Sequence, residues 1–545
     1  MMLHRPHRRR GKVLFGVVAA AVVGLTAPAA AGAPRDRHKI TARHYHPSAK
    51  PARHGRGQPA KARHFRLARE ASAPRVLADA MAPRAEEPMP AANLQFASVA
   101  TEPLAEFIPA AKTGPAAGRA GLGRLVIGFA QAGFLAILLV LAAYTLRHWL
   151  FTLNRLFRPV TAPYTDIDTA DWPEITVFIA AHNEEAVIAN CLEALLDVDY
   201  PRDRLHLVPV NDRSSDGTRA IIDGYVARFP GRIAPFHRSS GKAGKAAALK
   251  DAMAYAHGDI IIVFDADYIP GRNLLKQLVA PFFDPEVGAV MGRVVPLNAA
   301  SNLLTRLLDL ERSAGYQVDQ QARMNLSLVP QYGGTVGGIR RSAMTAAGGW
   351  HDDVLAEDTD ITYRLLLRGW RTVYMNRAEC YEEVPEAWPV RLRQIGRWSK
   401  GHNQALARHL AGLIRSPRVP LATKVDGALL LGVFALPAVI AFGLVLTLLL
   451  YFANAGLAGA AIASLALVAF GALGNFAAFF QIAAAAILDG YSRRLRLLPF
   501  NLLAFVISTV AIFRATVHLL VHDWLLKKEM VWDKTVRYRR PGAAL

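Results

Sequence analysis

Cysteine is scarce in this chain, since only Cys191 and Cys380 occur among its 545 residues. Two thiols exclude a fold held together by disulfides and any zinc or iron–sulfur site built mainly from cysteine. Acidic residues are also few, 43 against 64 lysines and arginines, so the formal net charge is +21. That balance indicates an anionic partner, either nucleic acid or a membrane surface, and the position of the charge decides between them.

Aromatic residues are nearly absent from the segment where the positive charge is concentrated. Residues 1–119 hold 20 Lys/Arg, only 7 Asp/Glu and seven of the 17 histidines. Over 34–120 these residues are mixed with Pro and Ala without a helical or strand period, which predicts a disordered basic arm. Because aromatics are so few, we expect no nucleic-acid partner and interpret the arm as a tether for anionic lipid or polysaccharide.

Long runs without charge occur at several places in the chain. Residues 1–33 combine a basic start, an apolar run and a small-residue exit, which is typical of a signal peptide or signal anchor. Residues 124–148 are long enough to span a bilayer core of about 30 Å, and 428–488 is expected to hold two more spans. Arginines follow the first span, so the positive-inside bias predicts a cytoplasmic domain after it and an arm outside.

The last apolar stretch, 499–522, allows two interpretations. It contains Arg514 and His518, and a charged residue within a span is costly. If the stretch crossed the membrane, the basic tail 523–545 would lie outside, against the positive-inside bias. We therefore hypothesise an amphipathic helix at the cytoplasmic interface, with a membrane span as the alternative.

Residues 171–385 have the texture of an α/β domain, in which β-branched runs alternate with helical segments. Asn183 is the expected N-cap of the first helix. This order of elements implies a mostly parallel sheet, whose ligands bind at the carboxyl ends of the strands. The predicted strands are 175–180, 205–210 and 259–264, and the predicted helices are 182–196 and 218–229.

Three aspartates stand at the ends of predicted strands. Asp212 follows the second strand and is expected to accept hydrogen bonds from a uracil or a ribose. Asp265 and Asp267 follow the third strand with one alanine between them, so both carboxylates can reach one hard cation, Mg²⁺ or Mn²⁺. A lone Asp-x-Asp is often a solvated turn, but the clean apolar strand before this one favours a metal site.

A glycine-rich basic loop, Gly241-Lys242-Ala243-Gly244-Lys245, precedes the next predicted helix, 246–256. It could cradle phosphate through its backbone N–H groups and Lys245. The spacing differs from that of a P-loop, and no Ser or Thr follows the lysine. A solvated basic turn explains the loop equally well.

Glu357 and Asp358 belong to an acidic cluster that opens a predicted helix. The helix dipole favours carboxylates there, so capping explains the cluster without a function. A carboxylate beside a sugar hydroxyl is, however, what a displacement reaction needs as its general base. The sequence leaves both interpretations open at this point.

Residues 386–420 are predicted to lie at the membrane interface and to contain a basic, amphipathic helix. Gln394, Arg397 and Trp398 lie on it. Alone, the pattern indicates an ordinary membrane-surface helix. Arg397 could also neutralise a pyrophosphate, and Trp398 could stack on a sugar ring.

Taken together, these motifs resemble the membrane-integrated, processive family 2 glycosyltransferases, such as cellulose, hyaluronan, chitin-oligosaccharide and poly-N-acetylglucosamine synthases. The resemblance covers about 172–410, and its motifs occur in the family's order. The chain has Ala356 where the family's Thr-Glu-Asp motif has threonine. A further element, 532–535, is similar to a short gating loop of some members. The matched residues are Asp212, Asp265 and Asp267, Glu357 and Asp358, and Gln394, Arg397 and Trp398.

The resemblance implies a GT-A-like α/β nucleotide-sugar domain flanked by transmembrane helices, catalysing an inverting transfer from a UDP-sugar with Mg²⁺ or Mn²⁺. Asp358 would be the base, with Glu357 beside it. Asp212, Lys245, Asp265, Asp267 and Arg397 would bind the donor and its metal, and Gln394 and Trp398 the acceptor.

We accordingly expect a multi-pass protein of the bacterial inner membrane that extends a β-linked exopolysaccharide and extrudes it, with accessory export subunits. A non-processive enzyme that glycosylates a lipid is the alternative. A catalytically dead scaffold is disfavoured because every carboxylate of the motifs is present. The sugar and the linkage are not encoded in any motif.

Overall fold

The computed structural model describes residues 117–161, 171–453 and 478–526. The chain divides into two units, Met1–Pro109 and Ala110–Leu545, and all described residues belong to the second. The predicted signal segment, nearly all of the basic arm and the 532–535 element lie outside the described residues.

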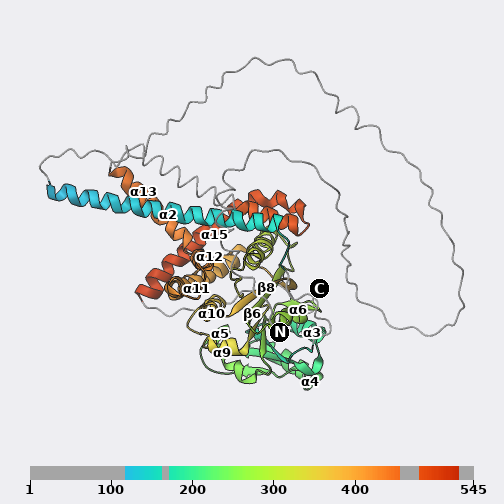
Figure 1. The fold of residues 1–545 in the computed structure, drawn as a ribbon. Coiled ribbons are helices and arrows are strands. Elements are labelled where there is room, and N and C mark those ends of the chain that lie inside the picture. The colour runs from blue at the N-terminus through green and yellow to red at the C-terminus, as the bar shows by residue number, and fades with distance from the viewer. Residues whose placement is uncertain (1–116, 162–170, 454–477, 527–545) are drawn as a thin grey trace, which may run out of the picture. The chain divides into compact units, whose positions relative to one another are not determined.

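An eight-stranded sheet forms the centre of the α/β domain (Figure 1). Its strands are β1 (Ile175–Ala181), β2 (Leu205–Asp212), β3 (Phe236–Arg238), β4 (Ile260–Asp265), β5 (Ile269–Pro270), β6 (Val287–Pro296), β7 (Gly337–Arg340) and β8 (Arg371–Glu382). They are arranged in the order β3-β2-β1-β4-β7-β6-β8-β5. β7 is antiparallel to β4 and β6, and β5 is antiparallel to β8. The sheet is therefore mixed. The pairs among β1 to β4 and the pair of β6 with β8 are parallel, so the prediction of a mostly parallel sheet holds for four of the seven neighbouring pairs.

Helices cover both faces of this sheet. Alternate residues of β1 point to opposite sides, so Val177 packs in one buried cluster and Phe178 in the other. Helices α3, α4 and α6 close the first cluster, and α5, α9 and α10 close the second. Their bounds are α3 (Ile188–Leu196), α4 (Thr218–Arg228), α5 (Lys245–Ala252), α6 (Leu274–Val279), α9 (Arg341–Ala346) and α10 (Glu357–Leu367).

A second group of helices comes from two parts of the chain, one between β6 and β7 and one after β8. The π-helical segment η5 continues α7 without a break. Three short 3₁₀ turns complete the domain. The bounds are α7 (Leu303–Ser313), η5 (Ala314–Gln320), α8 (Gln321–Asn325) and α11 (Trp388–Arg415), with 3₁₀ turns η2 (Arg202–Arg204), η3 (Met253–Tyr255) and η4 (Ala280–Phe283).

The predicted N-cap at Asn183 is wrong. Helix α3 begins only at Ile188, after Val187, and no side chain caps it. Asn183 instead has a φ of 55°, and its side-chain oxygen accepts a hydrogen bond from the backbone N–H of Ser215 at 2.7 Å. β1 and β2 are parallel neighbours, so the loops after them meet at one edge of the sheet. The asparagine joins these two loops.

The first apolar helix, α2 (Ala117–Phe157), contains the predicted span 124–148 and extends past both of its ends. Its part from Gly123 to Phe157 is long and apolar enough to cross a membrane. The same holds for Ser492–Leu525, which contains η6 (Ser492–Leu497), α15 (Leu498–His518) and the π-helical η7 (Leu519–Leu525). Length and composition therefore allow either interpretation of 499–522.

The first part of the stretch 428–488, which was predicted to hold two spans, is sharply bent and has the geometry of a broken span or a re-entrant loop. Helices α12 (Leu421–Gly432) and α13 (Leu436–Phe452) occupy this region and meet at an angle of 82°. Pro437 stands in the first turn of α13 and has no N–H to continue the preceding helix. Of the second predicted span, only the helix Ala478–Leu488 lies among the described residues.

Candidate active site

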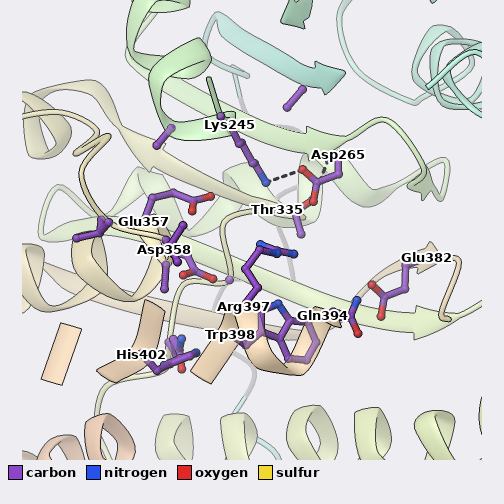
Figure 2. Close-up of a pocket in the computed structure, with 18 of the residues that line it drawn as sticks. Lys245, Asp265, Thr335, Glu357, Asp358, Glu382, Gln394, Arg397, Trp398 and His402 are labelled. Carbon is purple, nitrogen blue, oxygen red and sulfur yellow. Dashed lines mark hydrogen bonds and ion pairs between the residues drawn. The ribbon is translucent and has the colours of Figure 1, made fainter. Parts of the chain in front are cut away.

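A cavity of about 1200 Å³ opens where the carboxyl ends of β1, β2 and β4 face helix α11 and the segment α7–η5. All nine residues that the sequence predicted for the site line it, and Figure 2 shows Lys245 and Asp265 opposite Arg397 and Trp398. They are Asp212, Lys245, Asp265, Asp267, Glu357, Asp358, Gln394, Arg397 and Trp398.

Asp212 fixes the glycine-rich loop to the end of β2. One carboxylate oxygen accepts hydrogen bonds from Arg213 Nε at 2.9 Å and Arg238 Nη1 at 3.0 Å. The other accepts from the Gly244 backbone N–H at 3.2 Å. Burial raises the pKa of Asp212, but these three donors outweigh it and hold the pKa below its usual value. Asp212 is thus an ionised anchor whose oxygens retain further lone pairs for a donor.

Lys245, the first residue of α5, lies at the centre of the acidic half of the cavity. Its Nζ is 2.6 Å from Asp265 Oδ1 and donates to the Gly334 carbonyl at 2.9 Å. Burial lowers the pKa of Lys245, but the charges of Asp265 and Glu357 raise it above its usual value. The lysine is therefore a fixed positive charge beside the Asp-x-Asp motif.

The two motif carboxylates extend from the end of β4 into the same cavity. The Asp265 backbone N–H donates to Thr335 Oγ1 at 3.1 Å, which ties the strand end to the loop before β7. Asp267 is only 5% exposed. No cluster of three or more His, Cys, Asp or Glu side chains suited to a metal occurs in the described ranges. The pair thus fits a cation that takes its remaining ligands from substrate phosphate and water, as Mg²⁺ commonly does.

Glu357 and Asp358 occupy the first turn of α10, where the helix dipole favours negative charge. A Cβ on Gly334, whose φ is +73°, would lie 3.1 Å from Asp358 Cβ, so glycine lets this loop approach the acidic pair. Burial, together with the negative charges of Asp358 and Asp265, raises the pKa of Glu357 to about 7, although Lys245 opposes the shift. At neutral pH, Glu357 therefore carries a proton for much of the time.

Helix α11 presents Gln394, Arg397, Trp398 and His402 to the cavity, at a spacing that places them on one face. Gln394 Oε1 accepts a hydrogen bond from Arg391 at 2.9 Å. Arg397 Nε is buried, and within the described part of the chain it has no hydrogen-bond partner. In Figure 2 this guanidinium points from α11 toward the acidic half of the cavity.

Close packing brings α11 against the acidic loop. A Cβ on Gly401 would lie 2.7 Å from Ala356 Cβ, so a glycine is required at this crossing. His402 follows, with Nδ1 3.3 Å from Thr359 Oγ1 and its ring stacked on Phe434. Burial lowers the pKa of His402 despite the nearby charge of Asp358, so the imidazole is neutral.

Several cavity residues were not predicted as site residues from the sequence. They reach the cavity from the turn between β4 and β5, from the loop before β7, and from α7, β8 and α11, and none belongs to a motif that is recognisable at short spacing. Thr335 is the partial exception, because it ends the Tyr332-Gly333-Gly334-Thr335 turn. The most important of these residues are Tyr268, Arg312, Thr335, Glu382 and His402.

The central domain matches a known family model. Residues 173–401 match the family model described as "Glycosyltransferase like family 2". The chain is 36% identical over 249 residues to "Probable glycosyltransferase YdaM" of Bacillus subtilis, which covers 45% of this chain and 59% of that protein.

Two further relatives act on different acceptors by name. "Beta-monoglucosyldiacylglycerol synthase" of Synechocystis sp. is 33% identical over 240 residues, with 44% of this chain and 50% of that protein covered. "Glucomannan 4-beta-mannosyltransferase 7" of Arabidopsis thaliana is 28% identical over 264 residues, with 47% of each chain covered. The chain thus spans about half the length of these curated relatives.

Among solved structures, the chain is similar to "Mannosyltransferase PcManGT from Pyrobaculum calidifontis in complex with GDP-Man and Mn2+". The identity is 24% and the TM-score is 0.47, with 66% of this chain and 98% of that chain covered.

Proposed function

We propose that this protein, whose residues 173–401 are a family 2 glycosyltransferase domain, transfers a sugar from a UDP-sugar to an acceptor hydroxyl with inversion. The cavity carries the proposal. It brings paired carboxylates, an acidic helix start and an arginine whose buried Nε has no hydrogen-bond partner among the described residues around one space large enough for a nucleotide sugar.

The donor fits the half of the cavity between β2, β4 and α5. Asp212 and the loop it holds would contact the uracil and ribose, and Lys245 lies where a diphosphate would need positive charge. Arg397 approaches from α11. Its guanidinium presents several N–H donors in a planar fork, which suits phosphate oxygens and offsets the charge that develops on the leaving group.

Asp265 and Asp267 are the residues that would hold a divalent cation, because both carboxylates line the cavity beside the proposed diphosphate position. A cation bound there would act as a Lewis acid on the diphosphate leaving group. Without a bound cation, Lys245 balances the charge of Asp265, since its Nζ lies 2.6 Å from Asp265 Oδ1.

The transfer itself needs one base. Asp358 would take the proton from the acceptor hydroxyl, whose oxygen then forms a bond to the anomeric carbon from the side opposite the diphosphate. The bond from the anomeric carbon to the phosphate oxygen breaks, and its electron pair leaves with UDP. Glu357, with its raised pKa, would be partly neutral and so would not add a full second negative charge beside the base.

A growing β-linked polysaccharide is the acceptor that we propose, with a membrane lipid as the second candidate. Trp398 lies at the end of the cavity away from the glycine-rich loop, and an indole suits a sugar ring. The relative named as a glucomannan mannosyltransferase supports a polymer, and the one named as a glucosyldiacylglycerol synthase supports a lipid about equally. Extrusion of the polymer and accessory export subunits belong to the same proposal.

Membranes that contain the full chain should release UDP from one of four donors: UDP-glucose, UDP-galactose, UDP-N-acetylglucosamine or UDP-glucuronic acid. We expect release with Mn²⁺ to exceed that in a chelator by at least about tenfold, because the cation stabilises the leaving diphosphate. A ladder on a denaturing gel would support the polymer, and a single-sugar glycolipid would replace it with the lipid acceptor. Absence of release from all four donors would refute the UDP-sugar assignment.

We further propose that the protein is a multi-pass inner-membrane protein with a cytoplasmic catalytic domain, and that α15 lies at the interface rather than across the bilayer. Before α15, Asp489 pairs with Arg293 of β6 at 2.7 Å. After it, Asp523 of η7 pairs with Lys400 of α11 at 3.1 Å. α15 has 21 residues, about 31 Å. If α15 crossed the bilayer perpendicularly, its two ends would lie on opposite sides of the membrane. Asp489 and Asp523, which flank α15, instead both pair with elements beside the one catalytic cavity.

A topology reporter tests this placement of α15. Green fluorescent protein fused after Leu545 should fluoresce, and alkaline phosphatase fused at the same place should be inactive, because the tail stays in the cytoplasm. The same pair of reporters fused after Gly114 serves as the control and should give the opposite result, since the arm is expected outside. An active phosphatase after Leu545 would mean that α15 crosses the membrane.

A further inference from the structure

A chain of buried polar contacts links the metal-binding end of the cavity to helix α7. Tyr268, which follows Asp267 directly, donates its hydroxyl hydrogen to Glu382 Oε2 at 2.7 Å. The other oxygen of that carboxylate is 2.7 Å from Arg312 Nε. Tyr268 and Glu382 are each 6% exposed. Glu382 thus has a buried partner at each oxygen, a hydrogen bond at Oε2 and an ion pair with Arg312 at Oε1.

The same arginine reaches the tryptophan at the acceptor end. The Arg312 guanidinium carbon lies over the Trp398 indole, 5.2 Å from the ring centroid. A second guanidinium, that of Arg391, lies 5.1 Å from the same ring and is itself held by Glu311 at 2.6 and 2.9 Å. Both distances are within the range of a cation–π contact. Trp398 is thus braced by two arginines, each fixed by its own glutamate.

We propose that Arg312 is a positioning residue, which acts through Trp398 to hold the acceptor hydroxyl in line with the donor. The inference rests on the proposed function and deepens it. If the indole were free to change rotamer, acceptor binding would have to order it at a cost in conformational entropy. An indole that is already held in place avoids this cost. The hydrogen bond from Tyr268, which follows Asp267, orients Glu382, and Glu382 in turn orients Arg312.

The contact requires arginine. A planar guanidinium can pair edge-on with a carboxylate and still present its face to an aromatic ring, while a lysine ammonium is a point charge without a face. Because Arg312 contacts Trp398 directly, its loss should divert the reaction to water while the affinity for the UDP part of the donor stays nearly unchanged.

The test measures how much of the cleaved donor is transferred to the acceptor and how much is hydrolysed by water. Membranes with the full chain receive the radiolabelled UDP-sugar that the wild-type protein cleaves best, and labelled product is compared with total UDP released. Arg312→Gln is expected to lower this ratio about tenfold, while the Kd for UDP with Mn²⁺ changes by less than about twofold. Arg312→Lys should recover only part of the loss.

Arg306→Gln provides the matched control, because Arg306 lies on the same helix and is exposed. It should leave both the ratio and the UDP affinity unchanged. Glu382→Gln should reproduce part of the effect, and the double variant with Arg312→Gln should be no worse than Arg312→Gln alone, because both residues act in one chain of contacts.

Three results would overturn the inference: an unchanged ratio in Arg312→Gln, additive losses in the double variant, or a parallel loss of UDP affinity, which would indicate general damage to the fold. Wild-type membranes that release no UDP would instead refute the proposed function. The two failures are therefore distinguishable.

Discussion

Asp358→Asn is expected to lower sugar transfer by about 10²–10⁴-fold, the range of a lost general base, while UDP affinity stays close to that of the wild type. The asparagine keeps the shape of the side chain, and its oxygen can still accept the hydrogen bond that the Thr359 N–H donates at 2.6 Å. What it loses is the ability to take the acceptor's proton. Initial rates of UDP release and equilibrium binding of UDP with Mn²⁺ measure the two quantities.

Glu357→Gln is the matched control for this variant, because it neutralises the adjacent carboxylate in the same helical turn. Glu357 already has a pKa of about 7 through burial and the neighbouring negative charges. Its neutralisation should therefore reduce the rate much less than that of Asp358. Equal losses in the two variants, or full activity in Asp358→Asn, would contradict the assignment of the base.

Arg397→Ala is expected to lower the rate of transfer by about 10²–10³-fold, the usual effect of removing one donor that stabilises developing negative charge. Arg397 has no hydrogen-bond partner at its buried Nε among the described residues, so its loss breaks no internal ion pair that the structure records. The reduction should appear mainly in kcat, because the charge on the leaving diphosphate is greatest in the transition state. Steady-state kinetics with varied donor concentration separate kcat from KM.

Arg393→Ala serves as the control, since Arg393 is exposed and lies one helical turn before Arg397 on α11. It removes the same charge from the same helix and should leave both kinetic parameters within about twofold. If Arg393→Ala impaired transfer as much as Arg397→Ala, the loss of rate would be caused by the reduced positive charge of α11 and not by a lost contact with the diphosphate.

The sequence was sufficient to find the candidate site where its residues follow strands or recur along one helix. Asp265 and Asp267 follow an apolar run, and parallel strands place such positions at one edge of a sheet. Gln394, Arg397 and Trp398 share a helical face by spacing alone. All of them line one cavity in the structure.

Local signals failed where a tertiary contact competed with them. Asn183 had the residue type of a helix cap, yet its side chain joins the loop after β2, because a neighbouring parallel strand brings the Ser215 N–H within 2.7 Å. The apolar run from 428 gave no sign of a bend, but helices α12 and α13 meet there at 82°, with Pro437 in the first turn of α13. Hydropathy counts apolar residues and carries no information on direction.

The +21 charge, the apolar helices and the order of the carboxylate motifs were determined by the sequence alone, because each depends on composition or on spacing within one element. The partners of those carboxylates were decided by the tertiary structure. Lys245 meets Asp265 only because α5 packs on β1 and β2, and β1 is the neighbour of β4 in the sheet. Arg312 meets Glu382 and Trp398 only because α7, β8 and α11 converge on the cavity. Contacts between residues far apart in the chain follow from packing, which no short motif encodes.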